Sequence, residues 1–314
     1  MKIGVWAPNA AFDPETKKIS TGLKLDVDII KHYCQKKNYE FGICNEDSYD
    51  FDVVFSLEKT PPKKIIKLIK SMQGKIAWCV NTDLLSMYPG CIAKSNDIDF
   101  YIGKTSGQAE YLKSLDWNGE VCLINWASPF FEPKANAPIV NRNSLIHFAG
   151  SSLFKNSMEQ LRAGIKLVEM GHFDEMFLKL SSHKTSVIET IQRMKKLTKD
   201  HPKVHIIDSF LTEQEKTELY LKCRVALCAS SREGFGHYIL EAANHGCQVV
   251  TTDGKPMNEL LLNQVYLAKS TRKIPEDDSL WGYRYECKEN AVIEAALEAK
   301  QDNFIPTDAL RNVR

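Results

Sequence analysis

The sequence predicts an α/β protein built from two Rossmann-like domains. Short runs of β-branched and aromatic residues alternate with longer amphipathic segments, which is the pattern of the βα units that build parallel sheets. The pattern occurs twice, on either side of a proline-containing segment. The length of 314 residues favours the same division, because a single hydrophobic core stops growing near about 250–300 residues.

In the first half, the predicted strands are short apolar runs such as IAWCV at Ile76–Val80. The predicted helices carry apolar residues three and four positions apart, as in KKIIKLIKSM at Lys63–Met72. The strands of this half are Ile3–Trp6, Val53–Phe55, Ile76–Val80, Phe100–Ile102 and Val121–Leu123. The helices between them are Leu23–Lys36, Lys63–Met72 and Gly107–Leu115.

The segment after Ala127 reads SPFFEPKANAPIVNRNS, with three prolines and no hydrophobic period. It predicts an inter-domain linker. We therefore expect an N-terminal Rossmann-like domain at residues 1–140, a C-terminal Rossmann-like domain at residues 141–290, and a C-terminal helix and tail at residues 291–314.

The second half repeats the alternation with the same signals. Its predicted strands are Leu145–Phe148, Met176–Leu180, Val204–Ile207, Val225–Cys228, Gln248–Thr251 and Val265–Leu267. Its predicted helices are Ser157–Glu169, Ser186–Leu197, Glu213–Leu221, Tyr238–His245 and Ala291–Lys300.

Composition excludes several classes of protein. A hydrophobic content of 43% and a charged content of 26% are typical of a globular chain and not of a disordered one. A net charge of +1 gives no long-range field for a polyanion, so no nucleic-acid partner is expected. The nine scattered cysteines favour reduced thiols in a cytoplasmic protein over a zinc site. No apolar run approaches the roughly 18 residues of a membrane span.

The segment ASSREGFGHYILEAA, from Ala229, carries the chemistry. It follows the apolar strand VALC and leads into a helix, and a helix N-terminus after a glycine-bearing turn is an anion site. Glu233 lies on the turn and Glu241 about one helical turn inside the helix. Carboxylates accept paired hydrogen bonds from vicinal hydroxyls, so an anion site with two carboxylates predicts a sugar nucleotide as ligand.

The block Phe210–Leu260 resembles the donor half of the GT-B retaining glycosyltransferases of family 4, the glycosyl transferases group 1. The E-x7-E pair of that family is similar to Glu233 and Glu241, with E-G-F-G at its start. The resemblance extends across Leu145–Leu267, and in the first half it rests on the order of elements and on INWASPFFEP. It implies a GT-B fold, with the two domains facing each other across a cleft.

The resemblance implies roles residue by residue. Glu241 would hold the ribose hydroxyls, and Glu233 would contact the donor sugar. The backbone from Gly234 through Phe235, Gly236 and His237 to Tyr238 would hold the phosphate and sugar of the donor, and Leu211 and Thr212 would receive the base. Each role has a structural alternative. Glu241 reads equally as a helical surface glutamate, and Thr212 with Glu215 reads as a capping box.

The diphosphate requires cations, which the family supplies as an arginine and a lysine after the first strand of the second domain. Here the segment offers Gly150 and Lys155, with serine where the arginine is expected. Two unit charges about 4 Å apart interact by roughly 4 kcal/mol at an effective dielectric constant near 20, so the missing cation matters. Arg232 or His237 would be its substitute. The alternative for Lys155 is a solvated loop lysine.

Other signals carry less weight. Thr21 and Gly22 precede the first helix and either line the acceptor side or serve as an N-cap. The D-x-D patterns at Asp26–Asp28 and Asp97–Asp99 are interpreted as structural. The basic segments Lys63–Lys70 and Arg193–Lys203 are either solvated faces or peripheral membrane contacts.

The sequence therefore predicts transfer of a sugar, with retained configuration, from a nucleoside-diphosphate sugar to a hydroxyl on a glycan, a protein or a lipid-linked glycan. No cofactor and no metal are expected. No side-chain base is required either, because a phosphate oxygen of the leaving group can take the acceptor proton. Two alternatives remain open: a sugar-nucleotide binding protein without catalysis, and a DNA-modifying glycosyltransferase.

Overall fold

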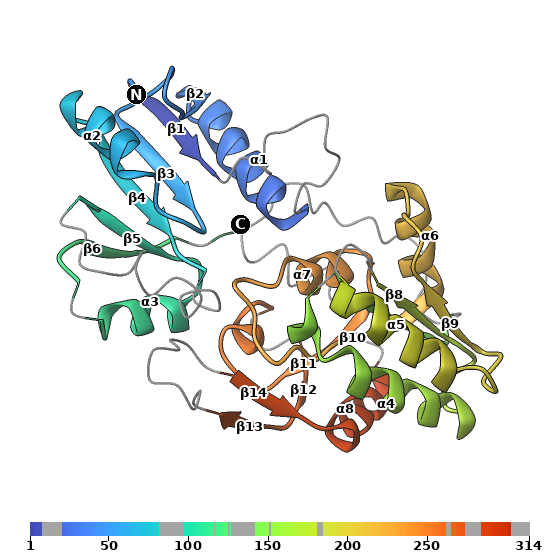
Figure 1. Ribbon diagram of the computed structural model, residues 1–314. Coiled ribbons are helices and arrows are strands. Elements are labelled where there is room, and N and C mark those ends of the chain that lie inside the picture. Colours follow the sequence, from blue (N-terminus) through green and yellow to red (C-terminus); the bar gives the residue numbers. More distant parts are fainter. Residues whose placement is uncertain are drawn as a thin grey trace. The chain divides into compact units, whose positions relative to one another are not determined.

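A computed structural model describes residues 1–7, 21–81, 97–115, 117–124, 126, 142–150, 152–180, 185–261, 265–273 and 284–302. The chain divides into two compact units (Figure 1). Unit 1 comprises Met1–Phe130 and Pro275–Gly282, and unit 2 comprises Phe131–Ile274 and Tyr283–Arg314. Residues 128–141 of the predicted linker and the tail from residue 303 lie outside the described residues, whereas the last linker residue, Ser144, begins β7.

Unit 1 is a six-stranded parallel sheet with strand order β2-β1-β3-β4-β5-β6. Its strands are β1 (Lys2–Trp6), β2 (Glu40–Ile43), β3 (Val53–Leu57), β4 (Lys75–Cys79), β5 (Phe100–Gly103) and β6 (Glu120–Leu123). Its helices are α1 (Thr21–Lys36), α2 (Lys63–Ser71) and α3 (Ser106–Lys113). The predicted elements are confirmed to within two residues at each end, and β2 is the strand that the sequence reading missed.

The missed strand has a physical explanation. The sequence of β2 is EFGI, four residues with a glycine and a glutamate, so it shows neither alternation nor a β-branched run. It pairs with β1 alone, at the edge of the sheet, where a strand needs only one partner to satisfy half of its backbone groups.

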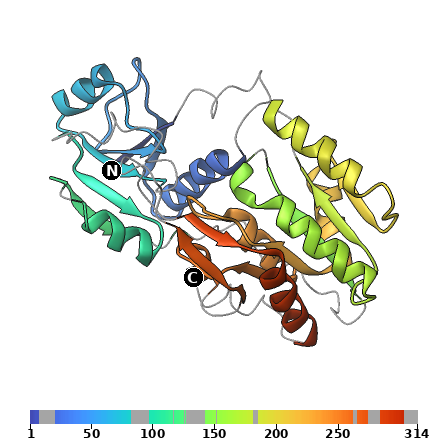
Figure 2. The ribbon, with the colours of Figure 1, turned by 60° about the horizontal axis from the view of Figure 1, so that its bottom comes forward.

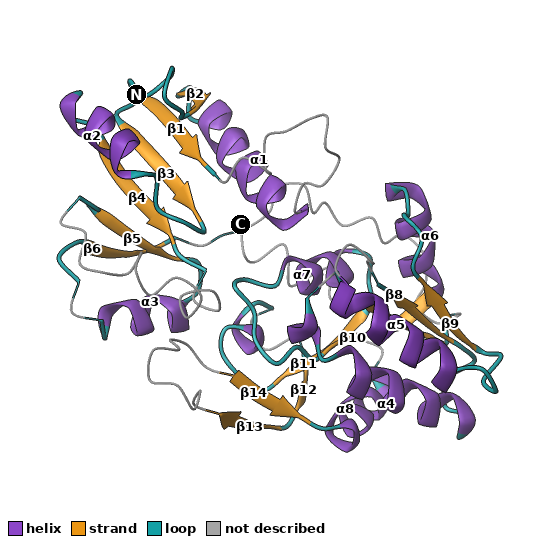
Figure 3. Cartoon of the chain, viewed as in Figure 1, coloured by secondary structure: helices purple, strands orange, loops and turns teal. Residues whose placement is uncertain are grey.

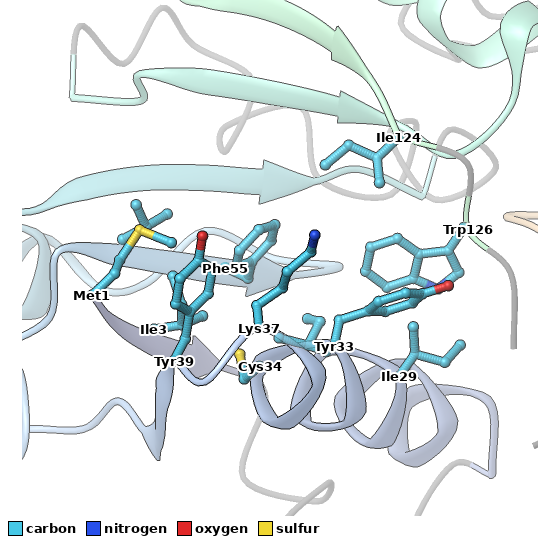
Figure 4. Close-up of a pocket in the computed structure, with 12 residues that line it drawn as sticks. Met1, Ile3, Ile29, Tyr33, Cys34, Lys37, Tyr39, Phe55, Ile124 and Trp126 are labelled. Atoms are coloured by element: carbon cyan, nitrogen blue, oxygen red, sulfur yellow. The ribbon is translucent and has the colours of Figure 1, made fainter. Parts of the chain in front are cut away.

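The two faces of the unit 1 sheet are covered by different helices. Ile65, Ile66 and Ile69 of α2 are buried in one cluster with Val54 of β3 and Trp78 of β4. Neighbouring residues of a strand point to opposite faces. The adjacent Val53 and Phe55 therefore face the other side, where they line a cavity of about 330 Å³ together with residues of α1 (Figure 4).

This cavity lies wholly within unit 1 and its walls are apolar apart from a few polar groups. Among the lining residues, Lys37 is charged, and Tyr33, Tyr39 and Trp126 each carry one polar group. Figure 4 shows Trp126 and Tyr33 together at one end and Met1 with Tyr39 at the other. Its volume lies at the lower end of the range of small-molecule sites, about 300–1,000 Å³.

One carboxylate of each D-x-D pattern has a structural role, as predicted. Asp26 is buried in α1, where its carboxylate lies 2.8 Å from the ammonium of Lys104 and accepts a hydrogen bond of 2.6 Å from the indole of Trp126. Asp99 lies 2.5 Å from the ammonium of Lys70 and also accepts from the backbone N–H of Ile76. Each of these carboxylates therefore ties elements of unit 1 together.

Unit 2 is a second six-stranded parallel sheet, with strand order β12-β11-β10-β7-β8-β9. Its strands are β7 (Ser144–Phe148), β8 (Met176–Lys179), β9 (Val204–Ile207), β10 (Cys223–Cys228), β11 (Gln248–Thr252) and β12 (Tyr266–Ala268). Its helices are α4 (Ser157–Glu169), α5 (Thr185–Leu197), α6 (Glu213–Lys222), α7 (His237–Asn244) and α8 (Glu289–Gln301). Two Rossmann-like domains, as predicted, are therefore present.

Two details of unit 2 depart from the sequence prediction. An antiparallel pair, β13 (Ser270–Lys273) with β14 (Arg284–Cys287), was not predicted, because STRK and RYEC are too polar to read as strands. The last helix begins at Glu289 rather than Ala291 and packs beside α4 and against β12 (Figure 2). Its buried face consists of Val292, Ala295, Ala296 and Ala299.

His147 lies in β7, at the centre of unit 2, and is fully buried. Its Nδ1 lies 2.7 Å from the carbonyl oxygen of Leu227 and its Nε2 lies 2.9 Å from Oγ of Ser157. Burial lowers the pKa of His147 from 6.5 to about 4, against the opposing effect of the Leu227 carbonyl. The folded protein therefore holds a neutral imidazole.

This histidine predicts an acid-dependent loss of stability. Between pH 6.5 and about 4 the unfolded chain binds a proton at His147 that the folded chain does not, so stability falls with pH through this window. We expect a contribution of about 2–3 kcal/mol to the loss between pH 7 and pH 4.5, measured by urea unfolding. His147→Gln, which keeps one donor and one acceptor, should flatten the profile. Parallel profiles for the two proteins would contradict the assignment.

The basic segments are partly neutralised by acidic neighbours. In α2, Lys64 lies 2.5 Å from Glu46 and Lys70 lies 2.5 Å from Asp99. In the second segment, Lys195 lies 2.8 Å from Asp208. These pairs reduce the positive potential that a membrane surface would attract. Across the described ranges, no helix has the length and apolarity that spanning a membrane requires.

Candidate functional site

The order of the unit 2 strands determines where a ligand would bind. Counted from β7, the sheet runs 3-2-1-4-5-6, and in such a sheet the strand order reverses between the first and fourth strands. These are β7 and β10, which pair side by side. Ligands of open α/β sheets bind beyond the carboxyl ends of the strands at this reversal. The loop after β7 contains Gly150 and Lys155, and the turn after β10 contains Glu233.

The turn after β10 leads directly into α7 (Figure 3). Gly236 is the N-cap residue of α7 and has a φ of 104°, which a residue with a side chain rarely adopts. A Cβ built at Gly236 would lie 2.9 Å from Cδ1 of Leu260. This glycine is therefore required by the backbone itself, whatever ligand binds. Phe235 is buried beside it, with its ring centre 4.9 Å from that of His237.

Gly236→Ala should destabilise the protein by about 1–3 kcal/mol, because it forces a side chain into a left-handed conformation and into contact with Leu260. The matched control is Gly150→Ala. Gly150 is exposed, and a Cβ built there has no neighbouring atom within 4 Å. Urea unfolding should leave the control within about 0.5 kcal/mol of the parent. Equal effects of the two substitutions would contradict the argument.

Lys155 joins the two loops. It ends a short 3₁₀ helix at Leu153–Lys155, and its ammonium lies 2.7 Å from Oε1 of Glu233 and 3.6 Å from the ring centre of Tyr238. The exposed fractions of the Lys155 and Glu233 side chains are 15% and 10%. The solvated-lysine alternative is therefore wrong. The predicted phosphate cation and the predicted sugar-contacting acid form one ion pair.

Tyr238 fixes the start of α7 to the end of β10. Its hydroxyl donates to the carbonyl oxygen of Cys228 at 2.8 Å and lies 2.5 Å from Oγ of Ser230. Burial, together with the negative charge of Glu233, raises the pKa of Tyr238 well above 10. The phenol is therefore held neutral, and its ring is the surface on which the Lys155 ammonium rests.

Arg232 packs against the same loop. It is 8% exposed, and its guanidinium carbon lies 4.1 Å from the ring centre of Phe154. The backbone N–H of Ser231 donates to the Phe154 carbonyl at 2.7 Å, which holds the two loops in register. The structure therefore brings a second cation against the short helix that contains Lys155.

Glu241 lies in the second turn of α7 and pairs with a residue that sequence reasoning missed. Its Oε1 lies 2.6 Å from the ammonium of Lys216 in α6, and that ammonium also lies 2.8 Å from Oε2 of Glu213. Burial lowers the pKa of Lys216, but the carboxylates of Glu241 and Glu213 outweigh it and raise the pKa above 10.5. Lys216 carried no signal in the sequence, because the pair joins residues of two different helices.

The structure confirms one of the two interpretations of the loop before α6. Thr212 is the N-cap residue of α6, and its hydroxyl accepts from the backbone N–H of Glu215 while the Glu215 carboxylate accepts from the Thr212 N–H. The capping box is therefore present. Leu211 is half-buried, and the neighbouring Phe210 is 89% exposed. The role of Leu211 and Thr212 in binding a base stays a prediction.

The candidate acceptor residues lie in unit 1. Thr21 and Gly22 were expected to precede the first helix, but α1 already begins at Thr21, so both belong to its first turn. Among the described residues, no three His, Cys, Asp or Glu side chains gather as a metal site would require.

Comparison with known proteins supports the resemblance to glycosyl transferases group 1 over part of the chain. Residues 153–274 match the family model of glycosyl transferases group 1. No curated protein matches the sequence closely enough to count as a relative.

Solved glycosyltransferase structures match both units. HepE of Anabaena in complex with UDP aligns with a TM-score of 0.63 at 13% identity, over 100% of this chain and 94% of that chain. A glycosyltransferase from Rickettsia africae aligns with a TM-score of 0.57 at 14% identity, over 99% and 96%. The E. coli trehalose-6-phosphate structure bound with UDP-2-fluoro glucose aligns with a TM-score of 0.62 at 10% identity, over 93% and 73%. The chain therefore has the GT-B fold.

Proposed function

We propose that the protein transfers a sugar from a nucleoside-diphosphate sugar to a hydroxyl acceptor, with retention of configuration and without an obligatory metal. The observation that carries the proposal is the Lys155–Glu233 ion pair at the reversal point of the unit 2 sheet. It places a cation and a hydrogen-bond acceptor where the phosphate and the hydroxyls of one ligand would lie together. The family match over residues 153–274 supports the same reading.

Each residue of the site has a proposed task. Lys155 and Arg232 stabilise the charge that develops on the diphosphate as the bond from the anomeric carbon to the phosphate oxygen breaks. The N-terminal amides of α7 contribute positive potential to the same group. The acceptor oxygen bonds to the anomeric carbon on the face that the diphosphate leaves, and its proton passes to a phosphate oxygen. Glu233 holds the sugar hydroxyls, and Glu241 holds the ribose.

The acceptor is proposed to be a glycan, a protein or a lipid-linked glycan. The apolar cavity of unit 1, which Lys37 also lines, supports the lipid-linked alternative, because the transfer of hydrocarbon from water into such a cavity is favourable. An engineered apolar cavity of about 150 Å³ holds benzene, so about 330 Å³ offers room for roughly twice as many carbons.

The test is a transfer assay with labelled UDP-, GDP- and ADP-sugars, preceded by a thermal-shift screen of the same donors. A ligand at 100 times its dissociation constant stabilises the native state by about 2.7 kcal/mol, which selects the donor. Acceptor sugars are then offered free and as alkyl glycosides. Transfer or donor hydrolysis supports the enzyme. Stabilisation without turnover supports the sugar-nucleotide binding protein, and absence of both rejects the proposal.

A further inference from the structure

Lys216 occupies a position between two carboxylates on neighbouring helices. Its ammonium lies 2.6 Å from Oε1 of Glu241 in α7 and 2.8 Å from Oε2 of Glu213 in the first turn of α6. The side chains of Lys216 and Glu241 are both 21% exposed, whereas that of Glu213 is 88% exposed. The contact with Glu241 is therefore the more shielded of the two, and the less weakened by solvent.

The two helices cannot move apart freely around this contact. Nδ1 of His245, just after α7, lies 2.8 Å from the carbonyl oxygen of Glu241. The same imidazole stacks on the ring of Tyr220 in α6 at 4.7 Å and lies 3.4 Å from the hydroxyl of Thr217. Because these contacts fix α6 against α7, the Lys216 ammonium has a defined position relative to Glu241.

An ammonium in a fixed position restricts the conformations of the carboxylate that it pairs with. A glutamate side chain rotates about three bonds, and a partner on one carboxylate oxygen removes much of that freedom. The ion pair uses Oε1, and the second carboxylate oxygen, Oε2, has its own lone pairs with which to accept hydrogen bonds from a ligand. A carboxylate fixed in this way before binding avoids the entropy that a mobile one would lose on binding.

We infer that Lys216 is a positioning residue for nucleotide binding, which orients the Glu241 carboxylate to accept hydrogen bonds from the ribose hydroxyls. The inference rests on the proposed function. Lys216 also stands one turn from Thr212, the N-cap of the helix that follows the predicted base-binding loop. The ion pair thus links that loop and the ribose-binding carboxylate into one rigid element, and Lys216 contributes to the preference for a ribose that carries both hydroxyls.

The experiment compares the dissociation constants of UDP and 2′,3′-dideoxy-UDP, or of the GDP or ADP pair if the screen above selects that base. In the parent protein we expect UDP to bind roughly 10–100-fold more tightly than the dideoxy nucleotide, which is the usual contribution of hydrogen bonds to a charged group. In Lys216→Met we expect this preference to fall below about threefold, with the affinity for the dideoxy nucleotide changed by less than about twofold. Lys216→Arg should retain most of the preference.

Two control variants separate positioning from charge and folding. Lys222→Met removes a lysine from the last turn of the same helix and should leave the preference unchanged. Glu213→Gln removes the exposed partner of Lys216 and should also leave it unchanged. Circular dichroism and unfolding midpoints establish that each variant is folded.

The possible results have distinct meanings. If Lys216→Met weakens both nucleotides equally, Lys216 acts through charge or structure and the inference is overturned. If Lys216→Met keeps the preference while Glu241→Ala loses it, the inference is wrong and the ribose assignment stands. If Glu241→Ala keeps the preference, the ribose assignment of the proposed function fails, and the inference fails with it.

Discussion

Replacing Lys155 by methionine should lower the turnover of sugar transfer by about 10²–10³-fold. The expected loss is that of one preorganised group aimed at charge developing in the transition state. The substitution keeps the length of the side chain but leaves Glu233, which is 10% exposed, without the ammonium 2.7 Å away. An unpaired, mostly buried carboxylate should also cost about 1–3 kcal/mol of stability.

The two effects of this substitution can be separated. In the double variant Lys155→Met with Glu233→Gln, the uncompensated charge is gone, so stability should recover while turnover stays low. Lys166→Met is the matched control, since Lys166 pairs with Glu289 in the same unit and is 55% exposed. Turnover is measured with the donor selected by the thermal-shift screen. A Lys155→Met protein with more than half of the parent turnover would remove Lys155 from the mechanism.

Replacing Glu241 by alanine should remove most of the thermal stabilisation that a nucleotide provides. Loss of hydrogen bonds to a charged group reduces affinity by roughly 10–100-fold. At a concentration that stabilises the parent by about 2.7 kcal/mol, the variant should gain only about 0.4–1.4 kcal/mol. Differential scanning fluorimetry with increasing nucleotide measures the difference directly.

The control for this variant is Glu218→Ala. Glu218 lies in α6, and its carboxylate accepts a hydrogen bond of 2.9 Å from the exposed side chain of Gln214. Its removal should leave the nucleotide response at the parent value. If Glu241→Ala and Glu218→Ala respond alike to the nucleotide, Glu241 is a surface glutamate and the ribose lies elsewhere.

The sequence was sufficient for the architecture because its local signals agree with the fold. The apolar run VALC and the helix pattern that follows Gly236 predicted β10 and α7 to within two residues at each end. The same consistency held for inner strands such as β1 and β4, whose central residues are buried. It failed for β2 and for the β13–β14 pair, which lie at the margins of the sheets or outside them and carry polar residues.

The sequence predicted which residues belong to the candidate site, but it did not predict which of their side chains contact one another. Lys155 and Glu233 were both chosen from the motif, yet nothing in the sequence shows that their side chains would meet at 2.7 Å. Lys216 was not chosen at all, because its contact with Glu241 depends on how α6 packs beside α7. The sequence suggested that Gly236 lets the backbone approach a ligand closely. The structure shows a different requirement for glycine, a φ of 104°, which does not depend on any ligand.

The pairing of Lys155 with Glu233 also bears on which molecules the site rejects. An inorganic anion that paired with the Lys155 ammonium would leave the mostly buried Glu233 carboxylate without its counter-charge. The binding free energy gained from this exchange would be small. A compound with both phosphates and hydroxyls offers a new partner to each residue, a phosphate to Lys155 and hydroxyls to Glu233. Under the proposed function, this ion pair would favour a ligand that carries both phosphates and hydroxyls over inorganic phosphate alone.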